Sequence, residues 1–261
     1  MKNMKLTAAL LAVAAALQCF TGCGKKDEIK VNETAAPSVG GSELTGENFD
    51  QEAYFNKVME KIEKAEVATE APKLGTLGDL VTPKEDSEEA NLGPYRVSSN
   101  GVKMYFNDED FSSNLMLTLE QYFLSFPSAD YTKYTSCVFP SYIDEMGAFL
   151  QKDYNYDLKT SFAKQCSSLA KLMNGDYKIT RIRVEKPEQY TEGVDNLDNY
   201  FKSLDDVFGK AYYDQVKSES DGIVDACFYV MGQDSTGQET MIVSGYEIVF
   251  AQKDGRYYTF G

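Results

Sequence analysis

The sequence predicts an α+β fold, in which N-terminal helices pack on a curved, mainly antiparallel sheet. Two observations lead to this prediction. Amphipathic helix patterns dominate residues 112–173, whereas the chain closes with three strand patterns in succession. Elements segregated in this way are typical of α+β domains rather than of alternating α/β folds. Hydrophobic residues make up 43% of the chain and aromatic residues 13%, which is enough for a packed core.

Four helices are expected before the first long strand, at residues 112–125, 131–137, 141–151 and 157–173. In the first of them Leu115, Leu119 and Tyr122 recur at the spacing of one helix face. Asn174-Gly175 ends the fourth, because glycine is favoured just after a helix C-terminus. A further long helix is expected at residues 196–217.

The main strands are expected at residues 177–185, 223–231, 240–252 and 256–260, with a short leading strand at 102–106. Asp254-Gly255 separates the last two strands, and an Asp-Gly pair between strands is a strong hairpin signal. The prediction is therefore a four-stranded sheet covered by the N-terminal helices.

Composition divides the chain into three parts. We expect a signal peptide at residues 1–22, an acidic tether at 23–91 and a single α+β domain at 92–261. Residues 24–91 carry 8 basic and 16 acidic side chains. Because such a segment buries little apolar surface, we expect the tether to be disordered.

One part of the tether departs from this composition. Between residues 48 and 67, Val58 and Ile62 follow the spacing of an amphipathic helix, with Asn48 and Gln51 as its expected capping box. An isolated helix of this length is marginal in water. We expect it either to dock on the chain's own domain or to bind a partner.

The first residues have the form of a signal peptide. Lys2 and Lys5 precede an apolar run at residues 6–17, which at about 1.5 Å per residue is too short to cross a hydrocarbon core of ~30 Å. The run ends in Phe20-Thr21-Gly22-Cys23, which resembles the lipobox of bacterial lipoproteins. That resemblance implies cleavage between Gly22 and Cys23 and a lipidated Cys23, with acyl chains such as palmitate.

The lipobox resemblance also implies a location, the outer face of a bacterial cytoplasmic membrane, with the lipid bilayer as a partner. Two or three acyl chains hold a protein on a bilayer, whereas one gives only marginal binding. The alternatives are a secreted protein that is cut nearby and an uncleaved membrane helix. Lys25 and Lys26 speak against the helix, because retained positive charge favours the cytoplasmic side.

Composition excludes several classes of site. The chain has no histidine, so Ser-His-Asp triads, His general bases and His-ligated zinc sites are impossible within it. Its net charge of −15 disfavours nucleic acid as a partner. The acidic runs lack the spacing of an EF-hand loop, and no metal or cofactor is expected. Cys137, Cys166 and Cys227 allow at most one disulfide and are expected to be buried apolar side chains.

The order of helices and strands, together with the closing residues 246–250 and 253–258, resembles the NTF2-like superfamily, also called SnoaL-like or cystatin-like. It is similar in particular to uncharacterised lipoproteins of Gram-positive bacteria. The resemblance covers about residues 110–261 and implies a cone whose helices and sheet enclose a pocket. Members include isomerases, dehydratases, hydrolases and plain binding modules, so this fold does not by itself give a function.

Two acids are weak catalytic candidates. Asp225 and Glu247 interrupt the apolar faces of two closing strands, and a half-buried carboxyl group can have a raised pKa and act as an acid or base. The alternative is that these acids only face solvent or pair with Arg181 or Arg183 on the neighbouring strand.

Three functions remain open at this point. The preferred one is a membrane-anchored, non-enzymatic module that binds a protein or small-molecule ligand of unknown identity. The first alternative is a small-molecule isomerase or hydrolase that uses Asp225 or Glu247, and the second is an accessory solute-capture lipoprotein. A pocket lined by convergent acids favours the enzyme, whereas a filled cone with an exposed aromatic patch favours the binding module.

Overall fold

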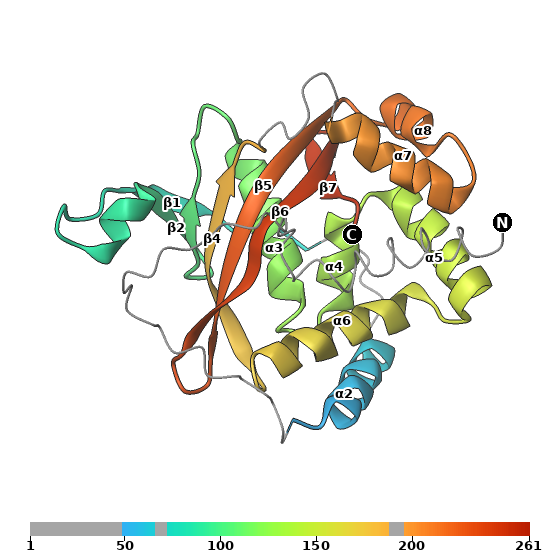
Figure 1. Cartoon of the computed structure of the whole chain (residues 1–261), viewed down its shortest axis with the longest axis horizontal. Helices are drawn as coiled ribbons and strands as arrows, with labels where there is room; N and C mark the ends of the chain where they lie inside the picture. Colours follow the sequence, from blue (N-terminus) through green and yellow to red (C-terminus); the bar gives the residue numbers. More distant parts are fainter. Residues whose placement is uncertain (1–48, 66–71, 188–195) are drawn as a thin grey trace, which may run out of the picture.

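The computed structural model describes residues 49–65, 72–187 and 196–261, and these form seven α-helices and one seven-stranded sheet (Figure 1). The helices are α2 (Gln51–Lys64), α3 (Ser113–Ser125), α4 (Tyr131–Cys137), α5 (Pro140–Tyr154), α6 (Leu158–Leu172), α7 (Asn196–Phe208) and α8 (Tyr212–Glu219), with a 3₁₀ helix η1 (Glu88–Leu92). The predicted α+β class is confirmed. The lipobox and the signal peptide lie outside the described residues.

The strands follow one another across the sheet in chain order. They are β1 (Leu77–Val81), β2 (Tyr95–Ser98), β3 (Lys103–Tyr105), β4 (Tyr177–Glu185), β5 (Gly222–Asp234), β6 (Glu239–Lys253) and β7 (Arg256–Thr259). Neighbours are antiparallel except β3 and β4, which are parallel and are connected through α3 to α6. The prediction of four strands is wrong, because β1, β2 and β3 extend the sheet beyond β4.

Part of the expected tether belongs to this sheet. β1 pairs with β2, with Leu80 opposite Arg96 and Val81 opposite Tyr95. Composition misses this strand because most of β1 is exposed, so it lacks the alternation of a half-buried strand. The described residues from 72 onward therefore differ from the disordered segment that was expected there.

The N-terminal helices pack on one side of the sheet (Figure 1). Phe123 of α3 meets Phe228 of β5 with ring centroids 5.2 Å apart. Behind α3, Phe126 and Tyr134 both contact Phe162 of α6, at 5.5 and 4.8 Å. These buried rings pack α3 against the sheet on one side and against α6 on the other.

The single helix expected at residues 196–217 is instead two helices. Gly209 has a φ of +67°, and its amide donates to the carbonyl of Asp205. A glycine in this left-handed conformation ends a helix, so the chain turns before α8 begins. The turn stacks Phe201 of α7 on Tyr213 of α8, with ring centroids 4.2 Å apart.

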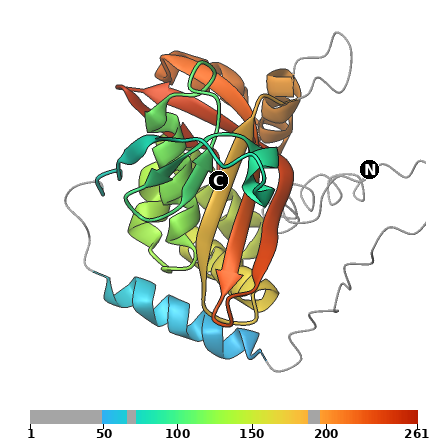
Figure 2. The same cartoon turned by 90° about the vertical axis from the view of Figure 1, so that its left-hand side faces the viewer.

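The amphipathic helix expected near residues 48–67 is α2, which lies against α6 and is the blue helix at the bottom of the view in Figure 2. Val58 and Ile62 are buried. Of the two expectations for this helix, the structure therefore shows the first, docking on the chain's own domain. Asp50 caps this helix by accepting a hydrogen bond from the amide of Ala53, and the predicted capping residue Asn48 lies outside the described residues.

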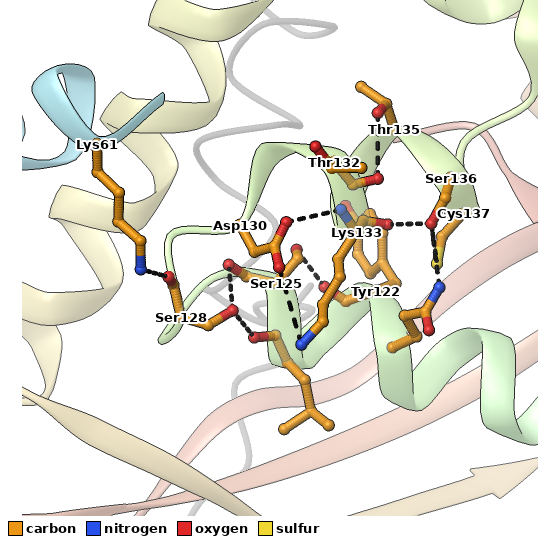
Figure 3. Close-up of polar contacts among 12 residues, drawn as sticks. Lys61, Tyr122, Ser125, Ser128, Asp130, Thr132, Lys133, Thr135, Ser136 and Cys137 are labelled. Carbon is orange, nitrogen blue, oxygen red and sulfur yellow. Dashed lines mark hydrogen bonds and ion pairs between the residues drawn. The ribbon is translucent and has the colours of Figure 1, made fainter. Parts of the chain in front are cut away.

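The turn between α3 and α4 also holds α2 (Figure 3). The Lys61 ammonium group donates to the carbonyl of Ser128, whose hydroxyl donates back to the carbonyl of Leu124 at 2.6 Å. Asp130 caps α4 by accepting from the amide of Lys133 at 2.9 Å. The Lys61 bond gives α2 a polar contact beside its apolar one, and the other two bonds hold the turn that accepts it.

Candidate functional site

The face of the sheet turned away from the helices carries charged and aromatic side chains. On β4, Ile182 and Val184 are buried toward the helices, whereas Arg181, Arg183 and Glu185 alternate with them on the opposite face. We call this opposite side the outer face. It is the side on which a ligand could reach several polar groups without opening the core.

One row of side chains crosses four strands of the outer face. Tyr95 on β2 lies against Tyr105 on β3, with ring centroids 5.1 Å apart. Tyr105 is opposite Arg183 in the parallel β3–β4 register, and Arg183 is opposite Tyr229 on β5. We call Tyr95, Tyr105, Arg183 and Tyr229 the outer row.

Arg183 is the centre of the outer row. Its guanidinium carbon lies 4.5 Å from the centroid of the Tyr229 ring, a cation–π contact worth roughly 0.5–1 kcal/mol at such a partly exposed site. Its terminal nitrogen pairs with Glu185 at 3.0 Å. Burial raises the pKa of Tyr229, so this phenol is neutral at physiological pH.

A bulge in β6 makes room for the outer row. Val230 is opposite Val243 and Phe228 opposite Tyr246, so two residues of β6 face Tyr229 alone. One of the two is Gly245, with a φ of +63°, and a Cβ built there would lie 3.3 Å from the Tyr229 hydroxyl. A glycine therefore both adopts this backbone conformation and leaves space for the ring.

The two predicted acids lie on neighbouring strands. Asp225 is opposite Val249, and Glu247 is opposite Cys227, so the acids share one face two residues apart. Burial, and then the nearby Asp225 carboxylate, raise the pKa of Glu247. The structure thus brings the two candidates together. On the neighbouring strand β4, Arg181 pairs with Glu239 and Arg183 pairs with Glu185.

A cleft of about 520 Å³ opens where β3 and β4 end. Its apolar lining comes from β1, η1, the η1–β2 connection, β4 and the segment after β3, and consists of Leu80, Leu92, Pro94, Phe106, Phe111 and Val184. Tyr105 and Arg183 of the outer row also line it. This cleft could not be predicted from the sequence, because its walls come from segments about 100 residues apart that only the parallel β3–β4 pairing brings together.

The cysteines in the described residues are free. Cys137, Cys166 and Cys227 are all buried, as expected, and no disulfide joins them. Burial raises the pKa of Cys137 to about 11, and it also raises the pKa values of Cys166 and Cys227. Because the thiolate is the reactive form, these thiols are suited to packing rather than to nucleophilic or redox work.

Glu120 is a buried acid that the sequence analysis did not identify. It lies on α3 with 1% of its surface exposed, and it accepts a hydrogen bond from the hydroxyl of Ser98. That hydroxyl in turn accepts from the amides of Asn100 and Val102, so the acid fastens the β2–β3 turn to the helix layer. Burial raises the pKa of Glu120. An acid among apolar positions of a helix, between Leu119 and Tyr122, was the available signal.

Metal sites and membrane spans are both absent from the described part of the chain, residues 49–65, 72–187 and 196–261. No group of three or more Cys, Asp or Glu side chains there could hold a metal ion, and none of its helices is long and apolar enough to span a membrane. The proposed cleavage and lipidation residues, Gly22 and Cys23, lie outside that part.

Comparison with known proteins adds no relative. No protein-family model, curated protein or solved structure matches this chain.

Proposed function

We propose that this chain is a lipoprotein held on the outer face of a bacterial cytoplasmic membrane by acylated Cys23. Its α+β domain, of NTF2-like type in this proposal, is a non-enzymatic module that binds a ligand or protein partner on the outer face of its sheet. The motif Phe20-Thr21-Gly22-Cys23 supports the anchor. Two acyl chains or more would make membrane attachment lasting.

One observation carries the binding proposal: buried rings pack α3 against the sheet, whereas partly exposed polar and aromatic groups lie on the outer face. Phe123 of α3 and Phe228 of β5, which contact each other, are each 3% exposed. The side chain of Arg183, by contrast, is 32% exposed and lies beside an open cleft. A packed interior leaves the outer face as the surface on which a partner finds both apolar area and hydrogen-bonding groups.

The anchor is tested by cell fractionation of Cys23→Ser against the unchanged chain. We expect the unchanged chain in the membrane fraction with a lipid-sized mass added at Cys23, and the variant as uncleaved precursor or released protein. Normal processing and full membrane retention of the variant would contradict the anchor.

The outer-face binding is tested by cross-linking in intact cells. We expect a discrete cross-linked species that is lost in Tyr229→Ala and retained in Lys152→Glu, an exposed control on α5 on the helix side. The same cross-linking pattern in both variants would contradict binding through the outer face.

A second candidate, hydrolysis or isomerisation, is favoured by one observation, the raised pKa of Glu247 beside Asp225. Such a carboxyl group can hold a proton near neutral pH and exchange it with a substrate. Nitrophenyl esters are suitable probes for the hydrolytic case. If this candidate is correct, the unchanged chain hydrolyses one of them and Glu247→Gln does not, whereas equal rates would exclude a role for Glu247.

A further inference from the structure

A small cavity of about 110 Å³ lies beside α3 and shares no lining residue with the outer row or with the larger cleft. Its walls come from residues 73–75, Asn100 in the β2–β3 turn, α3 and Lys133 of α4. The Thr76 amide donates to the Ser99 hydroxyl at 3.1 Å, and the Ser99 amide donates to the Thr76 carbonyl at 2.8 Å, so residues 73–75 are held against the turn. A water molecule takes up about 30 Å³ of the liquid, so the cavity has room for about four waters or for one solute of that size.

The buried wall of this cavity is made of hydrogen-bond acceptors. Glu120 and Gln121 of α3 line it with 1% and 7% of their surfaces exposed. The Ser98 hydroxyl donates to Glu120 Oε1. A Cβ built at Gly75, which also lines the cavity, would lie 3.8 Å from Glu120 Oε2, so this second oxygen is the one on the cavity side. An ionised carboxylate offers about four acceptor positions, more than its protein donors use.

Gln121 supplies the second acceptor. Its Nε2 donates to the Ser136 hydroxyl at 3.0 Å, which fixes the amide group and leaves the amide oxygen to accept. The buried wall can therefore receive several N–H donors from one ligand group.

The rim of the cavity, by contrast, is cationic. Lys133 has a side chain that is 39% exposed, and its ammonium nitrogen is 3.8 Å from Asp130 Oδ2, which is longer than a hydrogen bond (Figure 3). Lys73 is exposed, and no carboxylate of the described residues forms an ion pair with it. Both lysines line the cavity, so two ammonium groups can receive a ligand carboxylate there.

We propose that this cavity binds a small free α-amino acid, such as glycine, alanine or serine. The ligand's ammonium group lies on Glu120 and Gln121, and its carboxylate lies between Lys73 and Lys133. A simple anion fits less well because it meets the Glu120 carboxylate, and a simple cation because it meets the two lysines, whereas a zwitterion satisfies both ends. The volume of the cavity restricts the ligand's side chain to a small one.

The binding should depend on pH through Glu120. Burial raises the pKa of this carboxyl group, and a bound ammonium group stabilises its ionised form. Affinity should therefore increase as pH rises through that pKa, and binding below it should release a proton.

The experiment is isothermal titration calorimetry of the full-length protein in detergent with L-alanine, propionate and ethylamine. We expect alanine to bind one-to-one. Propionate and ethylamine, which each lack one of its charges, should bind about tenfold more weakly or worse, since each loses a charge-assisted hydrogen bond. Glu120→Gln should weaken alanine binding by about tenfold and remove its pH dependence, because an amide replaces the charged acceptor.

Lys133→Met should weaken alanine binding several-fold. Lys152→Met is its matched control, because Lys152 is exposed on α5 and lies outside the cavity, and it should bind alanine like the unchanged chain. Thermal unfolding of each variant checks that it is folded, and Lys133→Met tests the site independently of Glu120.

The inference is overturned if glycine, alanine and serine all fail to bind, if propionate binds as tightly as alanine, or if Glu120→Gln and Lys133→Met both keep the affinity of the unchanged chain. The cavity and the outer row are separate sites, so Glu120→Gln should still form the cross-linked species in cells. Failure of amino-acid binding with that species intact would reject this inference and leave the proposed binding function standing.

Discussion

Arg183 and Tyr229 form a stacked pair across β4 and β5, with the guanidinium carbon 4.5 Å from the ring centroid. The position of the Tyr229 ring depends on a third residue, Gly245, which has no side chain of its own. Gly245 sits in the β6 bulge under the Tyr229 ring, and its positive φ and missing Cβ allow the ring to lie there. The geometry of the outer face is thus determined by a backbone irregularity as much as by its side chains.

Gly245→Ala should therefore destabilise the protein and disturb the outer row. Holding alanine at positive φ costs about 1–2 kcal/mol, and the new Cβ also presses on Tyr229. We expect a total loss of about 2 kcal/mol or more in the free energy of unfolding, measured by urea denaturation.

Gly237→Ala is the matched control for this change. Gly237 also has a positive φ, +90°, but a Cβ there would meet nothing within 4 Å. It should lose only the cost of backbone strain. Equal losses in the two variants would show that Tyr229 does not press on position 245.

The apolar contact between α2 and α6 gives a second prediction. Ile62 is 5% exposed. Ile62→Ala should lower the free energy of unfolding by about 2 kcal/mol, the lower end of the range for a buried isoleucine. The loss is at the lower end because α2 can detach without unfolding the sheet. Hydrogen exchange of the α2 amides should accelerate more than that of the β5 amides.

The control on the same helix is Glu63→Ala, at an exposed position. It should leave both stability and exchange unchanged within about 0.5 kcal/mol. If Ile62→Ala and Glu63→Ala behave alike, α2 does not contribute to the stability of the domain.

The elements that the sequence predicted well are those that are half-buried and regular. β4 alternates buried and partly or fully exposed residues from Arg181 to Glu185, and its predicted bounds, 177–185, are those of the observed strand. β1 could not be found in this way, because four of its five residues are exposed. Its place in the sheet is determined by pairing with β2, and this pairing cannot be read from the local pattern of residues.

The candidate site was less predictable than the fold, for a related reason. Asp225 and Glu247 could be found because each interrupts an apolar strand, a local signal. The stack of Arg183 on Tyr229 joins strands 46 positions apart and depends on the register and on the β6 bulge. Both are consequences of pairing between distant segments rather than of composition or spacing.

Thiol labelling gives a third prediction, which needs no mutation. Cys137 and Cys166 are at most 1% exposed, and burial raises the pKa of both thiols, so almost no reactive thiolate is available at pH 8. After alkylation, peptide mapping by mass spectrometry should find both thiols unmodified in the folded protein. Both should be fully modified in guanidinium chloride at about 6 M, which unfolds the chain. Rapid labelling of Cys166 in the folded protein would contradict the packing of α6.

The buried acid Glu120 gives the last prediction, a pH dependence of stability. Its pKa is raised in the folded state, so its contribution is fully present below the unfolded pKa of a glutamic acid and is lost as pH rises through the folded pKa. Glu120→Gln cannot ionise, yet its amide oxygen can still accept from Ser98, so the variant should gain stability relative to the unchanged chain between pH 4 and pH 7. Glu120→Ala is the control that removes the acceptor, and it should lose about 1–3 kcal/mol because the Ser98 hydroxyl is left buried without it. Urea denaturation at both pH values measures these differences, and a Glu120→Gln difference that does not change with pH would mean that Glu120 titrates alike in the folded and unfolded chains.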